Sequence, residues 1–219
     1  MERVRKNLTR KRKVNKYEKQ SIKKYDRTAS NYDNTVDGRY TAKVKKLLIK
    51  HILVNDGDKV LDVGCGSGDL IDSINQLADM NAYGIDISPQ MITECKRKYQ
   101  DIKFSVSNGE TIDFDDNYFD VVVICCVLHH LNNPQNFFKE AHRILKPNGK
   151  LIVAEPNYPP VIKQIADYVV LPLLRAGDNK LFTHRKLTKL FVNNNFALTQ
   201  TIKKNMKQII IGEAIPPAP

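Results

Sequence analysis

The residues best suited to hold a ligand form a glycine-rich segment, VLDVGCGSG at positions 60–68. An apolar stretch precedes its three glycines, Gly64, Gly66 and Gly68, and a helical pattern follows them. Glycine is needed where the backbone takes left-handed angles or where a ligand comes too close for a Cβ atom. At the start of a helix, such a turn holds ligands against backbone N–H groups. The segment therefore predicts a ligand-binding loop between a strand and a helix.

A carboxylate at the end of the next strand makes this prediction more specific. Asp86 ends the stretch YGID at 83–86, which places it 20 residues after Gly66. In dinucleotide-binding folds an acidic residue at this place accepts hydrogen bonds from ribose hydroxyls. The loop and Asp86 together predict an adenosine-type cofactor, and the alternative is that Asp86 only caps the following helix.

The spacing within the loop indicates which kind of cofactor it holds. The glycines follow the pattern G-x-G-x-G, whereas the pyrophosphate-binding fingerprint is G-x-G-x-x-G. Asp62, two residues before Gly64, adds a carboxylate that repels a pyrophosphate but attracts an ammonium or sulfonium group. We therefore expect a ligand with a ribose, an amino acid group and no phosphate, which disfavours an NAD-dependent oxidoreductase.

The elements that must position these residues alternate between strand and helix. Strand patterns lie at 59–63, 82–86, 102–106, 120–125 and 150–155, and helical patterns between them at 69–77, 89–99 and 134–145. The continuous apolar run at 120–125 is typical of a strand buried on both faces of a parallel sheet. This repetition predicts an α/β, Rossmann-like fold with helices on both faces of a mostly parallel sheet. A helix at 183–192 and strands at 196–202 and 208–212 predict a C-terminal antiparallel hairpin.

Six ordered blocks carry a family resemblance: YDRTASNYD at 25–33, VLDVGCGSG at 60–68, YGIDIS at 83–88, SNGETIDFDDNYFD at 107–120, VLHHL at 127–131 and RILKPNGKL at 143–151. Their order and spacing resemble the class I S-adenosylmethionine (SAM)-dependent methyltransferases, in particular the broad family containing the ubiquinone/menaquinone-biosynthesis methyltransferases. The resemblance implies a seven-stranded sheet whose last strand is antiparallel, SAM as cofactor, and methyl transfer to a small-molecule or lipid-like, quinone-type acceptor. The acceptor and its reacting atom stay open.

The resemblance also implies roles for residues at the cofactor site. Gly64, Gly66 and Gly68 would line the methionine portion, with Asp62 supporting the loop and the cofactor amine, and Asp86 would bind the ribose hydroxyls. The other implied contacts are Ile87 and Met91 packing on the adenine, Asn108 and Gly109 at its edge, and the Cys125 backbone carbonyl on the methionine amine. Many relatives have Asp at the position of Asn108, whose side-chain carbonyl accepts hydrogen bonds equally well.

One segment departs from the family pattern without changing the functional prediction. Asn194-Asn195-Phe196 replaces the usual small-Gly-Phe before the sixth strand. The turn there needs left-handed backbone angles, which asparagine tolerates better than most residues.

Methyl transfer from a sulfonium depends mainly on alignment and on exclusion of water, since the cofactor carries the reactive group. A base is needed only where the acceptor loses a proton. The candidates for proton transfer or substrate contact are His129, His130, Tyr32, Tyr158 and His184. The alternative for each is packing or a surface hydrogen bond, and Tyr25 and Tyr32 are expected on a helix that caps the site.

The net charge of +11 is concentrated at the N-terminus. Residues 1–24 hold eleven Lys and Arg but two acids, which leaves 24 basic and 22 acidic residues for the remainder. We expect residues 1–20 to form a basic flexible tail before a methyltransferase domain at 21–219, with 156–182 as a variable lid and substrate segment. The tail is passive, contacts an anionic membrane, or contacts RNA through residues 1–24.

Other features narrow the class of protein. The longest apolar run, residues 121–128, is short beside the roughly 20 residues of a membrane-spanning helix. The four cysteines lack metal-ligand spacing, so we expect reduced thiols, no metal site and a cytoplasmic location. The alternatives to a small-molecule methyltransferase are an RNA methyltransferase that uses the basic tail and a SAM-binding protein without turnover. The oligomeric state stays open.

Overall fold

The computed structural model describes residues 16–157 and 181–216 of the 219-residue chain. Its helices are α1 (Lys16–Thr28), α2 (Val36–Leu48), α3 (Asp69–Asn75), α4 (Pro89–Lys98), α5 (Pro134–Ile144) and α8 (His184–Val192), with short 3-10 helices η1 (Ala29–Asn34) and η2 (Leu128–His130). Its strands are β1 (Lys59–Val63), β2 (Asn81–Asp86), β3 (Lys103–Val106), β4 (Phe119–Cys125), β5 (Leu145–Pro156), β6 (Phe196–Lys204) and β7 (Lys207–Ala214).

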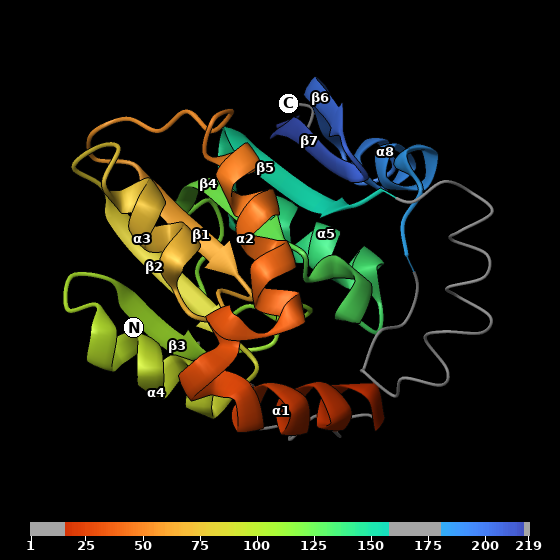
Figure 1. Ribbon diagram of the computed structural model, residues 1–219. Coiled ribbons are helices and arrows are strands. Elements are labelled where there is room, and N and C mark those ends of the chain that lie inside the picture. The colour runs from red at the N-terminus through yellow and green to blue at the C-terminus, as the bar shows by residue number, and fades with distance from the viewer. Residues whose placement is uncertain (1–15, 158–180, 217–219) are drawn as a thin grey trace, which may run out of the picture.

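The strands form one seven-stranded sheet in the order β3-β2-β1-β4-β5-β7-β6 (Figure 1). The first five strands pair in parallel, whereas β7 pairs antiparallel with both β5 and β6. The expected α/β, Rossmann-like fold and its C-terminal antiparallel hairpin are therefore confirmed.

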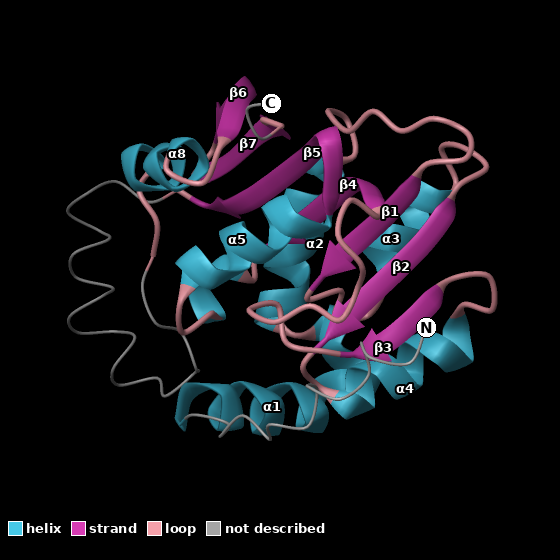
Figure 2. Ribbon diagram, turned by 180° about the vertical axis from the view of Figure 1, so that it is seen from behind, coloured by secondary structure: helices cyan, strands magenta, loops and turns pink. Residues whose placement is uncertain are grey.

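Helices cover both faces of this sheet (Figure 2). Along β4, Val121 and Val123 join a core with α2, α3 and α4, whereas Val122 and Ile124 join a second core with α5 and α8. Successive strand residues point to opposite faces, so a strand with a core on each side needs an unbroken apolar run. This arrangement explains the sequence of β4.

Local side chains fix several helix ends. The side chains of Thr35, Ser88 and Thr183 accept hydrogen bonds from backbone N–H groups in the first turns of α2, α4 and α8. Asn195, before β6, has a φ of 61°. It takes the left-handed geometry expected of it.

Two boundaries differ from the sequence prediction. Helix α1 begins at Lys16, inside the expected tail of residues 1–20, and Glu18 in it is only 5% exposed. The start of this helix was not predicted because its first turns are strongly basic and lack the apolar periodicity that indicates a helix. Glu18, the residue buried there, is an acid. Strand β5 begins at Leu145, before the expected turn at Pro147-Asn148-Gly149. Asn148 has left-handed backbone angles, and the register with β4 shifts in this part of the strand. Residues 1–15 and most of the segment 156–182 lie outside the described residues.

A membrane crossing requires a long apolar helix, and none of the helices within residues 16–157 and 181–216 meets that requirement.

Candidate functional site

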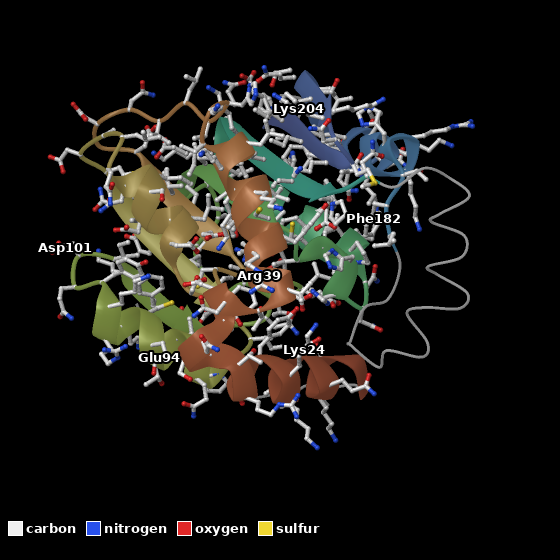
Figure 3. All side chains as sticks on the ribbon, in the orientation of Figure 1. Lys24, Arg39, Glu94, Asp101, Phe182 and Lys204 are labelled. Carbon is white, nitrogen blue, oxygen red and sulfur yellow. The ribbon has the colours of Figure 1, made fainter. Side chains whose placement is uncertain are left out.

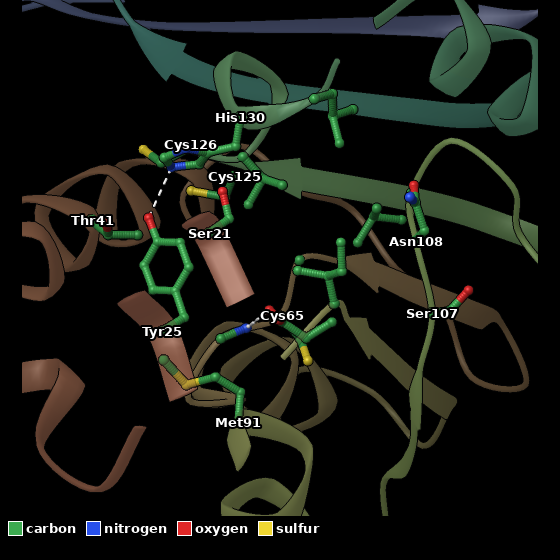
Figure 4. A pocket seen from close by; sticks show the side chains of 18 of the residues that line it. Ser21, Tyr25, Thr41, Cys65, Met91, Ser107, Asn108, Cys125, Cys126 and His130 are labelled. Atoms are coloured by element: carbon green, nitrogen blue, oxygen red, sulfur yellow. Dashed lines mark hydrogen bonds between the residues drawn. The ribbon is translucent and has the colours of Figure 1, made fainter. Parts of the chain in front are cut away.

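A pocket opens at the carboxyl ends of β1, β2 and β4. The strand order reverses between β1 and β4, and ligands of open α/β sheets bind at such a reversal. The pocket has an empty volume of about 840 Å³ including its mouth, which is within the range of small-molecule and cofactor sites. The glycine loop, the 107–110 loop, the end of β4 and parts of α1 and α2 contribute to its lining (Figure 4).

The three glycines of the loop have different environments, although all have positive φ angles. Gly64 and Gly66 line the pocket, and Gly68 does not. A Cβ atom on Gly64 would lie 2.5 Å from Val127, and one on Gly68 would lie 2.8 Å from the Tyr99 ring. A Cβ atom on Gly66 would meet only Tyr32, at 3.8 Å, so the backbone at Gly66 faces open space. Gly68 thus differs from the expectation, because it caps α3 against protein side chains.

Asp86 connects the glycine loop to the start of α4. Its Oδ2 accepts a hydrogen bond from the Gly66 N–H, and its Oδ1 accepts one from the Ser88 N–H, both at 2.9 Å. Burial raises the pKa of Asp86, and these two N–H groups act in the opposite direction. The helix cap is Ser88, whose hydroxyl accepts from the Met91 N–H at 3.1 Å. The alternative in which Asp86 itself caps the helix is therefore wrong.

A buried charge cluster lies beneath the glycine loop. Lys45 of α2 lines the pocket and forms an ion pair with Asp69, the first residue of α3. Asp62, the fourth of the five residues of β1, is 1% exposed, and neither of its carboxylate oxygens has a hydrogen-bond partner. Burial raises the pKa of Asp62 to about 7, and the positive charge of Lys45 opposes that rise. A buried carboxylate without partners is costly, so a cationic group at this place is stabilised.

The opposite side of the pocket carries the residues expected near an adenine. Ile87, Met91, Asn108 and Gly109 all line it, and Figure 4 shows Asn108 and Met91 on different walls. The Asn108 Nδ2 donates to Glu18, and its Oδ1 accepts from the Glu110 N–H at 2.7 Å. A carbonyl oxygen has two lone pairs, so Asn108 can accept a second hydrogen bond.

Helix α1 contributes Glu18, Ser21 and Tyr25 to the pocket lining. The Tyr25 hydroxyl lies 2.9 Å from His130 Nε2 in a hydrogen bond that joins α1 to η2, drawn as a dashed line in Figure 4. The Ser88 hydroxyl donates to Asp26 at 2.5 Å, which joins α1 to the start of α4. Tyr32, in η1, also lines the pocket, and burial raises the pKa of its hydroxyl to about 12. Tyr25 and Tyr32 thus line the pocket from two different elements, α1 and η1, rather than from the single helix expected, and their capping role stays a prediction.

The other catalytic candidates lie farther out. His129 is not among the pocket-lining residues, and its Nδ1 is 2.6 Å from Oε2 of the fully buried Glu155. The second oxygen of Glu155 accepts from the Leu128 N–H at 2.9 Å, which fixes the turn after β4. His184 begins α8, outside the pocket lining, where burial lowers its pKa. Tyr158 lies outside the described residues.

Several pocket residues escaped the sequence prediction. Cys125 lines the pocket as expected, but Lys45, Glu18 and Thr41 do so too. One signal for Lys45 was available, since it adjoins Val44 on the apolar side of a helix where a charged residue is out of place. Glu18 gave a weaker signal as one of the two acids in a strongly basic segment.

Comparison with known proteins agrees with this geometry. Residues 61–153 match the family described as methyltransferase domain. Demethylmenaquinone methyltransferase from Tropheryma whipplei (strain Twist) is 36% identical over 146 residues, which cover 63% of this chain and 59% of that protein. This region of the chain is therefore similar to methyltransferase domains. The chain spans about three fifths of the length of this methyltransferase relative.

Two solved structures show the same methyltransferase fold. A putative methyltransferase in complex with the Haloferax volcanii Trm112 activator has a TM-score of 0.77 at 17% identity, covering 88% of this chain and 98% of that one. Geranyl diphosphate C-methyltransferase from Streptomyces coelicolor A3(2) has a TM-score of 0.74 at 13% identity, covering 92% and 100%. At these identities the likeness concerns the fold alone.

Proposed function

We propose that this protein binds SAM and transfers its methyl group to a small-molecule acceptor of lipid-like or quinone type. The observation that carries the proposal is one pocket in which Asp86 is bonded to the glycine loop and Lys45 is a lining residue. Asp62 is buried next to the lining residue Val63 and is under the electrostatic influence of Lys45. Two comparisons support it: one relative is a demethylmenaquinone methyltransferase, and one structural neighbour was crystallised with geranyl diphosphate and S-adenosylhomocysteine.

The charge cluster beneath the loop fits the amino acid end of SAM. That end carries an ammonium and a carboxylate, and the protein offers an unpartnered carboxylate at Asp62 and an ammonium at Lys45. The cofactor ammonium would stabilise the ionised form of Asp62, which burial makes unfavourable. The cofactor carboxylate would pair with Lys45. Gly64, Gly66 and the Cys125 carbonyl would border the same end.

The remaining cofactor contacts follow from the opposite side of the pocket. Asp86 would accept from the ribose hydroxyls with lone pairs that the two N–H donors leave available. Ile87 and Met91 would pack on the adenine, and Asn108 and Gly109 would meet its edge. Gly68 would contribute only through the shape of the loop.

Bound SAM supplies a methyl group on a positively charged sulfur, and the chain must align the acceptor with it and exclude water. Helix α1 provides that exclusion, because Tyr25 and Glu18 contact the far walls through His130 and Asn108. Tyr32 contributes a neutral hydroxyl, since its raised pKa keeps the phenol protonated at neutral pH. We assign it to packing and hydrogen bonding.

An acceptor that loses a proton needs a base, and we assign this role to the Tyr25–His130 pair. The Tyr25 hydroxyl would take the acceptor proton while passing its own to His130 Nε2, so one proton leaves the acceptor and one arrives on the imidazole. His129 would act as a positioning residue for the turn that carries His130. Glu155 is hydrogen-bonded both to the His129 ring and to the Leu128 N–H.

Acceptor selection would fall to the segment 156–182, which stays a prediction because residues 158–180 lie outside the described chain. Its two described ends lie close together, since Gln208 Nε2 donates to the carbonyls of both Pro156 and Phe182, at 3.0 and 2.8 Å. Replacing 156–182 with a relative's segment should change acceptor preference and leave SAM affinity within a few-fold. Lost SAM binding with unchanged preference would contradict this assignment.

The test of the whole proposal is the release of S-adenosylhomocysteine from SAM by purified protein offered quinone-type, other small-molecule and RNA acceptors. We expect turnover with a quinone-type or other lipid-like acceptor and none with RNA. Calorimetry run in parallel separates the alternatives, because SAM binding without turnover on any acceptor would indicate a binding protein. Turnover restricted to RNA would revive the RNA methyltransferase alternative.

The base assignment has its own experiment, the pH dependence of kcat for His130→Gln and Tyr25→Phe. We expect kcat of the wild type to rise as the imidazole loses its proton, and both variants to lose that dependence with SAM affinity little changed. His142→Gln is the matched control, because His142 lies on α5 and bonds only the Ile215 carbonyl among the described contacts. A His130→Gln variant that keeps the wild-type pH profile would exclude the base role.

A further inference from the structure

A second hollow, on the outer side of α2, is lined by lysines. The C-terminal half of α2 and the β6–β7 hairpin border it, and its basic residues are Lys43, Lys46, Lys50, Lys203, Lys204 and Lys207. We call this feature the lysine groove. Lys43 and Lys46 are three residues apart on α2, where such residues are neighbours, and Lys50 lies in the turn that follows the helix. Figure 3 shows Lys204 beside β6 and β7.

Within the described part of the chain, no acidic side chain compensates this charge. Among the described residues that line the groove there is no Asp or Glu, and within the described chain none of the six lysines forms an ion pair with a carboxylate. Residues 25–219 hold nearly equal numbers of basic and acidic side chains. The groove is therefore a local concentration of positive charge that the nearly neutral net charge of residues 25–219 does not reveal.

Hydrogen bonds hold the two sides of the groove together. The carbonyl of Met206, in the β6–β7 turn, accepts from the Tyr40 hydroxyl of α2 at 3.3 Å and from the Asn157 N–H at 2.8 Å. The Tyr40 bond joins the backbone of the hairpin turn to α2, and the Asn157 bond joins it to the end of β5. Such preorganisation lowers the cost of binding a polyanion.

Met206 itself is unusual for its place in the turn. Asn205 and Met206 both have positive φ angles, 46° and 58°, a geometry that favours Asn-Gly. Met206 is also 52% exposed, although it adjoins the charged groove. An exposed apolar side chain beside a row of lysines fits an environment that pairs anionic groups with apolar ones.

We propose that the lysine groove docks the protein on an anionic lipid surface, with the lysines facing phosphate head groups and Met206 inserted between them. Lysines near such a surface each contribute favourable electrostatic energy, and half-buried Leu47 and Ile202 add apolar lining. RNA fits less well, because the described lining residues include no Phe, Tyr, Trp or Arg, and His51 is the one ring among them. The proposal does not depend on methyl transfer.

The test is sedimentation of the full chain with phosphatidylcholine vesicles, with and without phosphatidylglycerol. We expect binding only with the anionic lipid, and a fall on the order of 100-fold for Lys43→Gln/Lys46→Gln/Lys50→Gln, given about fivefold for each lysine. The control Lys96→Gln/Lys139→Gln/Lys189→Gln removes the same charge from exposed positions outside the groove and should fall much less. Equal losses in both triple variants would overturn the proposal in favour of general charge attraction.

Met206→Asn separates a lipid surface from other polyanions. Asparagine suits the left-handed turn, so folding should be preserved while the apolar side chain is lost. We expect vesicle binding to weaken several-fold, with binding of single-stranded RNA or soluble polyphosphate unchanged. Unchanged vesicle binding by Met206→Asn, or groove-dependent binding of RNA without binding of vesicles, would overturn the lipid assignment. Either result can be read without a methyl-transfer assay, so it leaves the proposed function standing.

Discussion

Adjacent residues on α2 serve two different regions of the molecule. Lys45 faces the cofactor pocket, is 7% exposed and is paired with Asp69. Lys46 faces the lysine groove, is exposed and has no ion pair among the described residues. One helix therefore places one lysine in a buried site and the next in a solvent-exposed one. This is possible because successive helix positions differ in direction by about a quarter turn.

Burial, rather than residue type, decides the role of each of these two lysines. In the pocket Lys45 has a specific counterpart in Asp69, and removing Lys45 leaves that carboxylate and the buried Asp62 without a nearby positive charge. In the groove the charges are solvated and act together, so the loss of any one has little effect on folding. The pocket suits one defined ligand, and the groove suits an extended anionic surface.

The largest expected effect comes from Asp86 in the pocket. Asp86→Ala should weaken SAM binding by about 2–4 kcal/mol, since it removes a carboxylate placed for two charge-assisted hydrogen bonds and frees the Gly66 N–H. Calorimetric titration measures this, with the exposed Asp101→Ala as control. Unchanged SAM affinity, or tight NAD binding by the wild type, would remove the basis of the cofactor assignment.

The pair Lys45→Met and Lys46→Met tests the comparison itself. Lys45→Met should lower the free energy of unfolding by about 2 kcal/mol, a value below that of a fully buried pair because Asp69 is partly exposed. Lys46→Met should change it by about 0.5 kcal/mol or less. Urea denaturation of both variants is the measurement, and equal effects would break the distinction between the two regions.

Asp62 should give the pocket a pH dependence that the groove lacks. Its pKa in the fold, about 7, lies above its ordinary value of 3.8. Its contribution to stability is therefore full below pH 3.8 and is lost as the pH rises toward 7, because the unfolded chain releases the proton first. Relative to the wild type, Asp62→Asn should gain roughly 1–3 kcal/mol between pH 4 and pH 8. A pH-independent difference in urea denaturation would contradict the raised pKa.

The same group links SAM binding to protons. A cation favours ionised Asp62, so binding near pH 6 should release a proton and should tighten as the pH approaches 7. Calorimetry in buffers of different ionisation enthalpy measures that release, and Asp62→Asn should abolish it. Proton release of the same size from the variant would assign it to another group.

The smallest effect is expected from removal of the N-terminus. Residues 1–15 are rich in basic and poor in apolar side chains, so we predict that deleting them changes thermal stability and SAM affinity little. Deleting residues 1–20 should weaken SAM binding more, because Glu18 contacts Asn108. If the groove docks on lipid, salt-sensitive vesicle binding should survive the shorter deletion. Its complete loss would place the electrostatic site on the tail.

Features of the fold and site that depend on residues close together in the sequence could be predicted. Features that depend on residues far apart in the sequence could not. The strands, helices and glycine loop were predictable because hydrophobic periodicity and turn residues act within a few positions. Asp86 was predictable because consecutive parallel strands end at one edge of the sheet. The Gly68 contact was not, because the three glycines look alike in sequence and differ only in which side chain packs on each.

By itself, the sequence determined the alternation of strand and helix, the glycine loop with its acidic partner, and the left-handed turn at Asn195. Only the tertiary structure decided that Tyr25 meets His130, 105 residues away, that Lys45 is buried, and that 43–50 and 203–207 share a groove. A periodic pattern states which face of an element is buried but leaves open which distant element covers it. These sites arise from such pairings, so their chemistry becomes visible only once the chain is packed.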